Sequence, residues 1–245
     1  LKKNSALHTM KTKPIARARI TTHTEEDLKI FFNNYQETLD HYGIHCARYI
    51  YNMDESGIGI GCPTGEIIIV PTEVKELYNA SPENRKSLTI IEAICLDGTP
   101  PPPPVIICPG EKIMESWIHE NLTGAEVITV SPTGYTNENI TLAWLDHLIK
   151  YIKAGLDKYW HMLLVDGHIT HHQGDFIIKY YVNNIVPFEF LSHLTHVLQP
   201  LDVGVFRPWK HYHKQAIHHA LRSLDIEYTI SSFFRDLDTI CKQTF

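Results

Sequence analysis

Short apolar segments of strand length recur along this chain and alternate with a few longer stretches of helical periodicity. The strand-like segments are rich in β-branched and aromatic residues and are bounded by turn-forming residues. They occupy residues 47–53, 66–70, 88–96, 105–108, 125–130, 161–165 and 189–191. Segment 88–96 is almost continuously apolar, which predicts a strand in the middle of a sheet.

Helical spacing of apolar residues appears in the segments that separate these strands. Thr24 and Asp27 resemble a capping box at the start of a helix over 22–42. Further helices are predicted over 139–154, 175–182 and 200–224. Strands first, with helices mixed in later, predict an α/β fold with a sheet covered by helices.

The composition narrows the class of protein. With 245 residues and 43% hydrophobic residues, the chain can build one large domain or two small ones, and wholesale disorder is excluded. Its apolar runs are too short for a transmembrane helix, and no secretory signal is present. The chain begins with Leu1, so we expect it to be an internal piece of a longer protein. Five cysteines without a C-x-x-C pair argue against a disulfide framework and favour a reducing compartment.

Charge is distributed unevenly along the chain. The net charge is −6, yet the first 19 residues contain six basic groups and no acid. Those groups are Lys2, Lys3, Lys11, Lys13, Arg17 and Arg19. The rest of the chain has 16 basic groups against 28 acidic ones. Such a basic arm on an acidic body suits an anionic partner at one edge, although charge alone favours a solvated tail.

Two of the predicted strands end at an aspartate. Asp54 follows residues 47–53, and Asp166 follows residues 161–165. In α/β proteins, binding and active sites lie at the carboxyl ends of the strands, where side chains are held rigidly. Each aspartate also fits an ordinary turn, because Asp and Gly suit turn geometry.

A third acid, Asp202, stands in an otherwise apolar stretch at the start of the last predicted helix. A buried, unpaired carboxylate is costly, so Asp202 is expected to be paired, to cap the helix or to bind a metal. Three carboxylates from separate elements form a cage that suits Mg²⁺ or Mn²⁺. Two such ions about 3.5–4 Å apart clamp the attacking and leaving oxygens of an in-line phosphoryl transfer.

The segments around these acids resemble a known family. They are residues 50–57 (IYNMDESG), 163–171 (LLVDGHITH) and 193–206 (HLTHVLQPLDVGVF). Their order and spacing are similar to the DDE-type transposases of the pogo group, within the Tc/mariner superfamily. The resemblance covers residues 25–225 and includes weaker blocks at 88–98 and 134–148. It departs from the family pattern at Ser56, at Ile58 and in residues 191–196, which puts substrate fit and the activity of this copy in question.

The resemblance implies a ribonuclease-H-like mixed sheet flanked by helices, with Asp54, Asp166 and Asp202 as the catalytic and metal-binding acids. Two Mg²⁺ or Mn²⁺ ions serve DNA strand cleavage and strand transfer at transposon ends in that family. It further implies double-stranded DNA as the partner, nuclear localisation and compatibility with a homodimer, with no membrane association. Residues 1–24 become a basic arm after a missing DNA-reading region, 25–225 the catalytic domain and 226–245 a C-terminal extension.

Several further residues are assigned secondary roles. His168 and His171, after Asp166, are expected to orient the site or to approach phosphate; a zinc site is disfavoured because Cys or His partners at finger spacing are missing. Glu55 points to the opposite side of an extended chain from Asp54. Candidate DNA contacts lie in the arm and on the last helix: Lys11, Lys13, Arg17, Arg19, Arg207, Lys210 and Lys214.

Two functions of different classes remain open. One is a metal-dependent DNA endonuclease and strand transferase. The other is a domesticated, inactive relative of the centromere protein B type, in which the fold binds DNA or chromatin. The three retained acids favour the enzyme. A serine or cysteine nucleophile and an ATP-driven mechanism are disfavoured, because no G-x-S-x-G and no glycine-rich phosphate loop is present.

Overall fold

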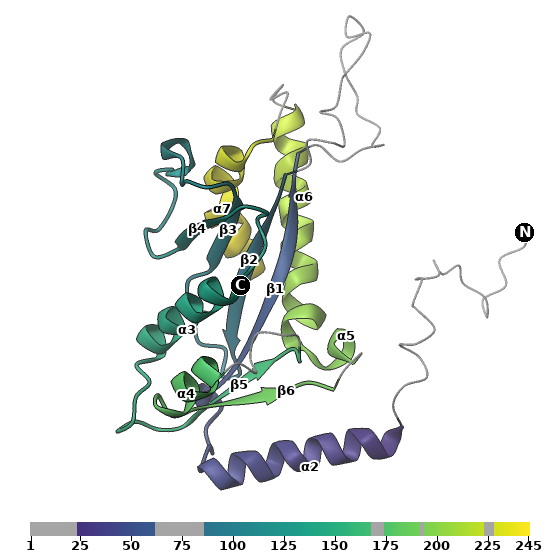
Figure 1. Cartoon of the computed structure of the whole chain (residues 1–245). Helices are drawn as coiled ribbons and strands as arrows, with labels where there is room; N and C mark the ends of the chain where they lie inside the picture. The colour runs from purple at the N-terminus through teal and green to yellow at the C-terminus, as the bar shows by residue number, and fades with distance from the viewer. Residues whose placement is uncertain (1–23, 62–85, 168–173, 192–193, 223–227) are drawn as a thin grey trace, which may run out of the picture.

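A six-stranded mixed sheet with helices on both faces forms the body of the molecule (Figure 1). The computed structural model describes residues 24–61, 86–167, 174–191, 194–222 and 228–245. The strands lie in the order β4-β3-β2-β1-β5-β6. Pairs β1/β2 and β2/β3 are antiparallel, whereas β1/β5, β3/β4 and β5/β6 are parallel. The α/β class predicted from the sequence is therefore confirmed.

The bounds of the elements follow the sequence patterns closely in most places. The strands are β1 Ile50–Ile60, β2 Lys86–Cys95, β3 Val105–Pro109, β4 Val127–Ser131, β5 His161–Val165 and β6 Ile185–Glu189. The longer helices are α2 Glu25–Tyr42, α3 Glu138–Ile152, α4 Gly174–Tyr181, α6 Phe206–Arg222 and α7 Ile230–Thr244. Short helical turns are η1 Ala47–Tyr49, η3 Glu115–Trp117, α5 Thr195–Leu198 and the π-helical turn η4 Leu201–Val205.

Local signals explain where the helices begin. The Thr24 hydroxyl accepts a hydrogen bond from the Asp27 N–H, and the Asp27 carboxylate accepts one from the Thr24 N–H, so the predicted capping box is confirmed. Gly43 ends α2 with φ 65°, a left-handed conformation that costs glycine little. The Asn137 side chain caps α3 in the same manner as Thr24 caps α2.

Three apolar clusters hold the helices on the sheet. The α3–α4 cluster covers one face and includes Tyr51, Met53, Leu145, Leu148 and Phe176. The α6–α7 cluster covers part of the other face and includes Ile58, Ile90, Trp209, Phe233 and Leu237. The α2 cluster covers the rest of that second face, near β5 and β6, and consists of Leu39, Ile44, Ile50, Met162 and Val186 (Figure 1).

The first predicted strand is corrected most strongly. The sequence predicted a strand over 47–53 that stops at an acidic turn after Met53, but β1 begins at Ile50 and continues through Asp54 to Ile60. Its second half pairs with β2 throughout, and Ile58 and Ile60 are buried in the α6–α7 cluster. Antiparallel pairing and burial of these isoleucines outweigh the turn preference of the Asp-Glu-Ser-Gly segment.

Other boundaries differ by smaller amounts. The short strand expected over 189–191 lies earlier, at β6, and the helix expected over 200–224 consists of η4 followed by α6. The segment 66–70 lies outside the described residues.

Helix α7 lies in the segment that the sequence analysis treated as an extension. Phe233 and Phe234 are completely buried in the α6–α7 cluster, and the Phe234 ring lies 6.4 Å from that of Trp117. A capping box of Thr229 and Ser232 starts the helix. Helix α7 therefore contributes to the same core as β2 and α6.

A buried carboxyl group interrupts this core. Glu92 in the middle of β2 is 1% exposed, and neither of its carboxylate oxygens has a hydrogen-bond partner. Burial raises the pKa of Glu92 to about 8. The neutral acid is thus the form that the fold tolerates.

Truncating Phe234 tests the contribution of α7 to the core. We expect Phe234→Ala to lower the free energy of unfolding by about 3–5 kcal/mol, because a fully buried aromatic side chain is removed. Phe245→Ala at the exposed end of the same helix is the control and should change it by less than about 0.5 kcal/mol. Urea unfolding followed by circular dichroism measures both. Equal, small effects would show that α7 is not part of the cooperative unit.

Glu92 makes the stability depend on pH. Its pKa is higher in the folded than in the unfolded chain, so its contribution is largest in acid and is lost as the pH rises toward about 8. Above the unfolded-state pKa the loss reaches at most about 1.4 kcal/mol per pH unit. Glu92→Gln removes the contribution of Glu92 and makes the loss smaller, whereas the exposed control Glu111→Gln should behave like the wild type. Urea unfolding at about pH 5.5 and about pH 8.5 measures the change in stability. Equal losses of stability in the wild type and both variants would contradict the assignment of this pH dependence to Glu92.

Candidate active site

The face of β1 that carries Asp54 is apolar at both ends and polar in the middle. Side chains alternate along a strand, so Ile50, Asn52, Asp54, Ser56 and Ile58 point to one face. Ile50 packs in the α2 cluster, and Ile58 packs in the α6–α7 cluster. The three polar side chains therefore lie between two apolar clusters.

Parallel pairing of β1 and β5 brings two of the predicted acids together. Asn52 lies opposite Leu164 in this register. Asp54 lies two residues after Asn52, and Asp166 lies two residues after Leu164. Asp166 directly follows the last residue of β5. The prediction that Asp166 follows a strand is confirmed. Asp54 reaches the same edge from within a strand instead of from its end.

The third acid approaches from the connection between α5 and α6. Asp202 is the second residue of η4, which contacts β1 and β2, and its side chain is exposed. Its neighbour Leu201 is completely buried, and the Leu201 N–H donates a hydrogen bond of 3.0 Å to Asn52 Oδ1. This anchor fixes the turn that carries Asp202 against β1.

The electrostatics of Asp54 link the three carboxyl groups. Burial, together with smaller contributions from the negative charges of Asp202 and Asp166, raises the pKa of Asp54 to about 7. A hydrogen bond of 2.8 Å from the Glu55 N–H to Asp54 Oδ1 acts in the opposite direction. The β1/β5 register and the contact of η4 with β1 bring the three carboxyl groups to one edge of the sheet.

Gln199 is a residue of this site that the sequence analysis missed. It is completely buried, and its side-chain amide faces Asp54 and favours the ionised carboxylate. Neither the nitrogen nor the oxygen of that amide is within hydrogen-bonding geometry of a partner, however. An amide between Leu198 and Pro200, in an apolar stretch, was the available signal. Buried polar groups without a hydrogen bond are rare in folded proteins and are often found at functional sites, and this one lies beside the acids.

The chemistry of these groups suits a hard divalent cation, although the cage is not closed. Within the described ranges, no group of three His, Cys, Asp or Glu side chains is arranged to hold a metal ion. The donors at this edge are carboxylate oxygens, which Mg²⁺ and Mn²⁺ prefer. The unpaired Gln199 amide is a polar group that metal-bound water would satisfy. The residues present therefore fit such an ion.

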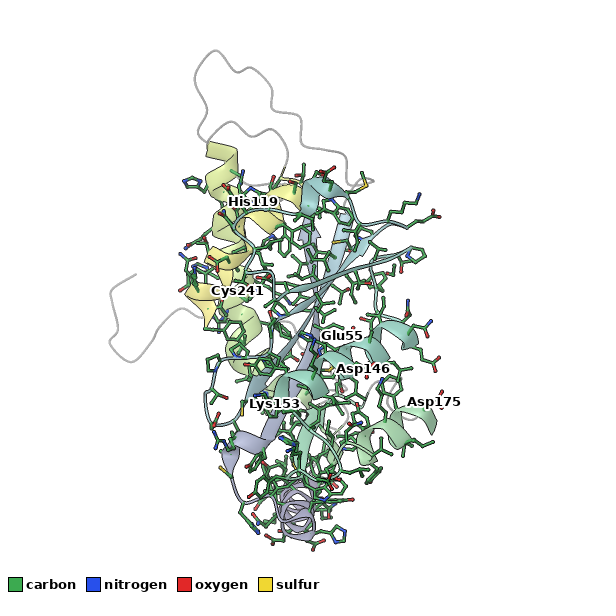
Figure 2. The ribbon with its side chains drawn as sticks, turned by 90° about the vertical axis from the view of Figure 1, so that its left-hand side faces the viewer. Glu55, His119, Asp146, Lys153, Asp175 and Cys241 are labelled. Atoms are coloured by element: carbon green, nitrogen blue, oxygen red, sulfur yellow. The ribbon has the colours of Figure 1, made fainter. Side chains whose placement is uncertain are left out.

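The remaining predicted site residues are distributed differently. His168 and His171 lie outside the described residues, as do the arm residues Lys11, Lys13, Arg17 and Arg19. Glu55 points to the α3 side of the sheet, where its carboxylate accepts a hydrogen bond from the Thr136 hydroxyl (Figure 2). It is thus turned away from the face that carries Asp54.

The three basic residues predicted on the last helix form an exposed stripe on α6. Arg207, Lys210 and Lys214 are spaced by three and four residues, which places them on one helix face. The Lys210 ammonium lies 5.8 Å from the centre of the Phe206 ring. The opposite face of α6 is buried through Trp209. We call these three residues the α6 basic stripe.

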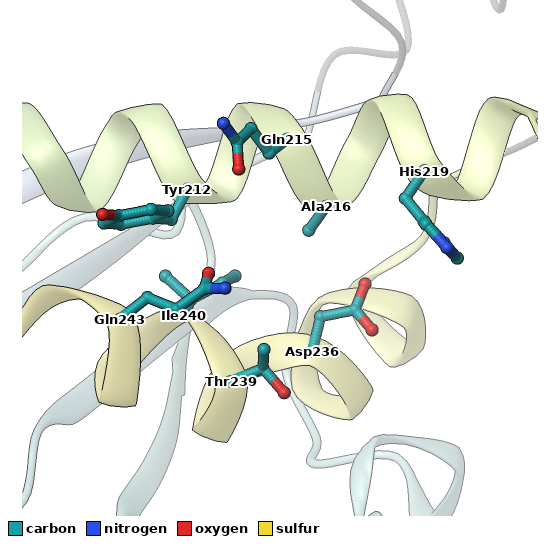
Figure 3. A pocket seen from close by; sticks show the side chains of 8 residues that line it. All are labelled: Tyr212, Gln215, Ala216, His219, Asp236, Thr239, Ile240 and Gln243. Carbon is teal, nitrogen blue, oxygen red and sulfur yellow. The ribbon is translucent and has the colours of Figure 1, made fainter.

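A separate groove of about 350 Å³ lies between α6 and α7 (Figure 3). Its lining consists of Tyr212, Gln215, Ala216, His219, Asp236, Thr239, Ile240 and Gln243. None of the three predicted acids contributes to it. The groove is therefore distinct from the acidic edge.

Comparison with known proteins gives a family and one curated relative. The sequence model of the DDE superfamily endonucleases matches residues 84–233, more than half of the chain. A protein of Cochliobolus lunatus described as "MFS-type transporter clz9" is 32% identical over 180 residues, which are 71% of this chain and 20% of that protein. The chain thus spans a fifth of that relative. In the described part of this chain, no helix combines the length and apolarity that a membrane crossing requires.

Solved structures share the fold at low sequence identity. The Mos1 strand transfer complex is 14% identical with a TM-score of 0.50, covering 95% of this chain and 63% of that chain. The Mos1 transposase paired-end complex with the left transposon end is 12% identical with a TM-score of 0.48, covering 95% and 64%. The catalytic domain of Mos1 mariner transposase is 12% identical with a TM-score of 0.43, covering 90% and 92%.

These comparisons agree with the fold that the structure shows. The fold is the ribonuclease-H-like mixed sheet with flanking helices that the sequence predicted. The family match includes the segments that carry Asp166 and Asp202. Because that match spans more than half of its residues, the chain belongs to the DDE superfamily of endonucleases.

Proposed function

We propose that this chain is the catalytic core of a pogo-type transposase, which cleaves DNA strands at transposon ends and transfers them to target DNA. One observation carries the proposal: the β1/β5 register and the contact of η4 with β1 bring Asp54, Asp166 and Asp202 from separate elements to one edge of the sheet. A carboxyl group whose pKa is raised, as that of Asp54 is, is typical of a catalytic site. Family membership supports the same chemistry.

Asp54, Asp166 and Asp202 are the residues that would hold Mg²⁺ or Mn²⁺ at this edge. When bound, these ions activate the attacking oxygen and stabilise the leaving oxygen of a phosphoryl transfer. Strands β1 and β5 fix two carboxylates rigidly, while η4 supplies the third. The Gln199 amide faces Asp54 and favours the ionised, ligating form of that carboxylate, against the burial that raises its pKa.

In the proposed reaction, the oxygen of water bonds to phosphorus while the bond from phosphorus to the 3′ oxygen breaks. Of the two protons of the water, one passes to solvent and the other to the departing 3′ oxygen, which leaves as a hydroxyl. That hydroxyl then attacks a phosphate of the target DNA and displaces another 3′ oxygen. Both steps are in-line substitutions at phosphorus, so one set of acids serves both.

Double-stranded DNA, at the transposon ends and at the target, is the proposed partner, and we propose that the chain acts in the nucleus. The α6 basic stripe follows Asp202 directly in sequence and suits phosphate contacts. The arm residues Lys11, Lys13, Arg17 and Arg19 are proposed to add such contacts. A homodimer that pairs two ends belongs to the same proposal.

Nicking of supercoiled plasmid tests the enzyme. We expect cleavage with Mg²⁺ or Mn²⁺ that falls on the order of 100-fold or more in Asp54→Asn, Asp166→Asn and Asp202→Asn, because each change removes a charged ligand. Glu55→Gln is the matched control, since Glu55 is adjacent to Asp54 but faces α3. Full cleavage in EDTA, or by the triple variant, would exclude this mechanism. Metal-independent DNA binding without cleavage would instead favour the domesticated, centromere protein B type of function.

The α6 basic stripe predicts how DNA binding depends on salt. Sequence is read by base-edge contacts, whereas phosphate contacts only position the protein. Arg207→Ala, Lys210→Ala and Lys214→Ala should each reduce the slope of log affinity against log salt by about 0.9, equally for all sequences. Lys150→Ala, an exposed change on α3 across the sheet, is the control.

Gel shifts with a family-type terminal repeat and with scrambled DNA, over a series of salt concentrations, provide the measurement. The same assay with Lys11, Lys13, Arg17 and Arg19 changed to Ala tests the arm. We expect weak binding with little sequence preference. Strong, salt-resistant discrimination would show that this chain reads bases itself and would contradict the assignment to phosphate contacts.

A further inference from the structure

A single buried side chain connects the three elements that carry the acids. Asn52 is 3% exposed and lies on β1, on the same face as Asp54. Its Nδ2 donates to the Leu164 carbonyl of β5 at 3.1 Å, and its Oδ1 accepts from the Leu201 N–H of η4 at 3.0 Å. The same Nδ2 also lies 3.2 Å from the Met53 carbonyl. Both ends of the amide are thus in use.

Each of these contacts lies beside an acid in the sequence. Asn52 precedes Asp54 by two residues, and Leu164 precedes Asp166 by two. Leu201 immediately precedes Asp202. We propose that Asn52 is a positioning residue that sets the spacing of the three aspartates by tying β1, β5 and η4 together; this inference rests on the proposed function.

The contact to η4 replaces a local helix cap. The first N–H groups of a helix have no partner within the helix and usually bond to a nearby side chain. The residue before η4 is Pro200, and no side chain caps this turn locally. The Leu201 N–H is instead satisfied by a side chain 149 positions earlier in the chain. The orientation of η4, and of Asp202 on it, therefore depends on the strand that carries Asp54.

The chemistry of asparagine suits this role. The position needs a donor toward β5 and an acceptor toward η4 on one short side chain, and the carboxamide supplies both. Aspartate keeps the acceptor and loses the donor. Alanine loses both and leaves the buried Leu201 N–H without its partner.

Hydrogen exchange of the metal-free chain tests the contact to η4. In Asn52→Ala, we expect the Leu201 amide to exchange about tenfold faster or more, the factor that one typical hydrogen bond provides. Asn52→Asp retains the acceptor and should keep the protection of that amide near the wild-type value. This second variant covers the case in which Asn52→Ala fails to fold. Unchanged Leu201 exchange in a folded Asn52→Ala, or lost protection in a folded Asn52→Asp, would overturn the proposal.

A matched control separates positioning from general loss of stability. The Thr89 hydroxyl, buried on β2, donates a hydrogen bond of 2.8 Å to the Gly134 carbonyl on the opposite face of the sheet. Thr89→Val removes one buried hydrogen bond with little change of shape. We expect it to leave the exchange of the Leu201 amide unaltered. A rise equal to that of Asn52→Ala would show that any destabilisation loosens η4, and the specific role would be wrong.

Titration with Mn²⁺ by calorimetry tests whether the contact sets the acids. We expect about tenfold weaker binding in Asn52→Ala and unchanged binding in Thr89→Val. Faster Leu201 exchange with unchanged Mn²⁺ affinity would overturn the proposal, because η4 would move without consequence for the acids. Wild-type protein that binds no Mn²⁺ would contradict the metal assignment of the proposed function, whereas the exchange experiment would still decide whether Asn52 anchors η4.

Discussion

The parallel pairing of β1 with β5 is the contact on which the acidic edge depends. With Asn52 opposite Leu164, these two strands bring Asp54 and Asp166 to the same level of the sheet. A shift of the register by one residue would turn one of these acids to the other face, because side chains alternate along a strand. The register is fixed by burial on both faces: Met53 and Leu163 pack in the α3–α4 cluster, whereas Ile50 packs in the α2 cluster.

The polar groups at the acidic edge destabilise the folded chain. Asp54 is half-buried near two further negative charges, and the Gln199 amide beside it lacks closed hydrogen bonds. Each of these features disfavours the folded state. The two apolar clusters on this face offset that cost, since they bury large side chains such as Trp209 on one side and Met162 on the other. A locally unfavourable site inside a consistent core is typical of a functional centre.

Much of this arrangement could be predicted from the sequence, and the failures have physical causes. The spacing of apolar residues located helices α2 and α3, and the apolar run before Asp166 correctly predicted β5. The end of β1 was wrong because turn propensity is local, whereas the continuation of the strand depends on pairing with β2. Helix α7 was missed as part of the core, since only the buried faces of β2 and α6 show what Phe233 and Phe234 pack against.

The polar residues around the acids show the same limit. An acid in an apolar stretch was recognised at Asp202, yet Glu92 and Gln199 occupy equally apolar surroundings and were passed over. Their burial follows from the way that distant segments meet, which no local pattern records.

The three acids also differ in how their positions are determined. Asp54 lies in β1 and Asp166 directly follows the neighbouring strand β5, so the hydrogen-bonded pairing of these two strands sets their relative position. Asp202 stands on a short helical turn without a local cap, and the turn is held by the buried Leu201 and by the Asn52 amide. Two acids are thus positioned by the backbone and the third by side-chain contacts. The sequence around Asp202 can specify a helix start, but the position of that start depends on contacts with distant residues, among them the Asn52 amide on the first strand.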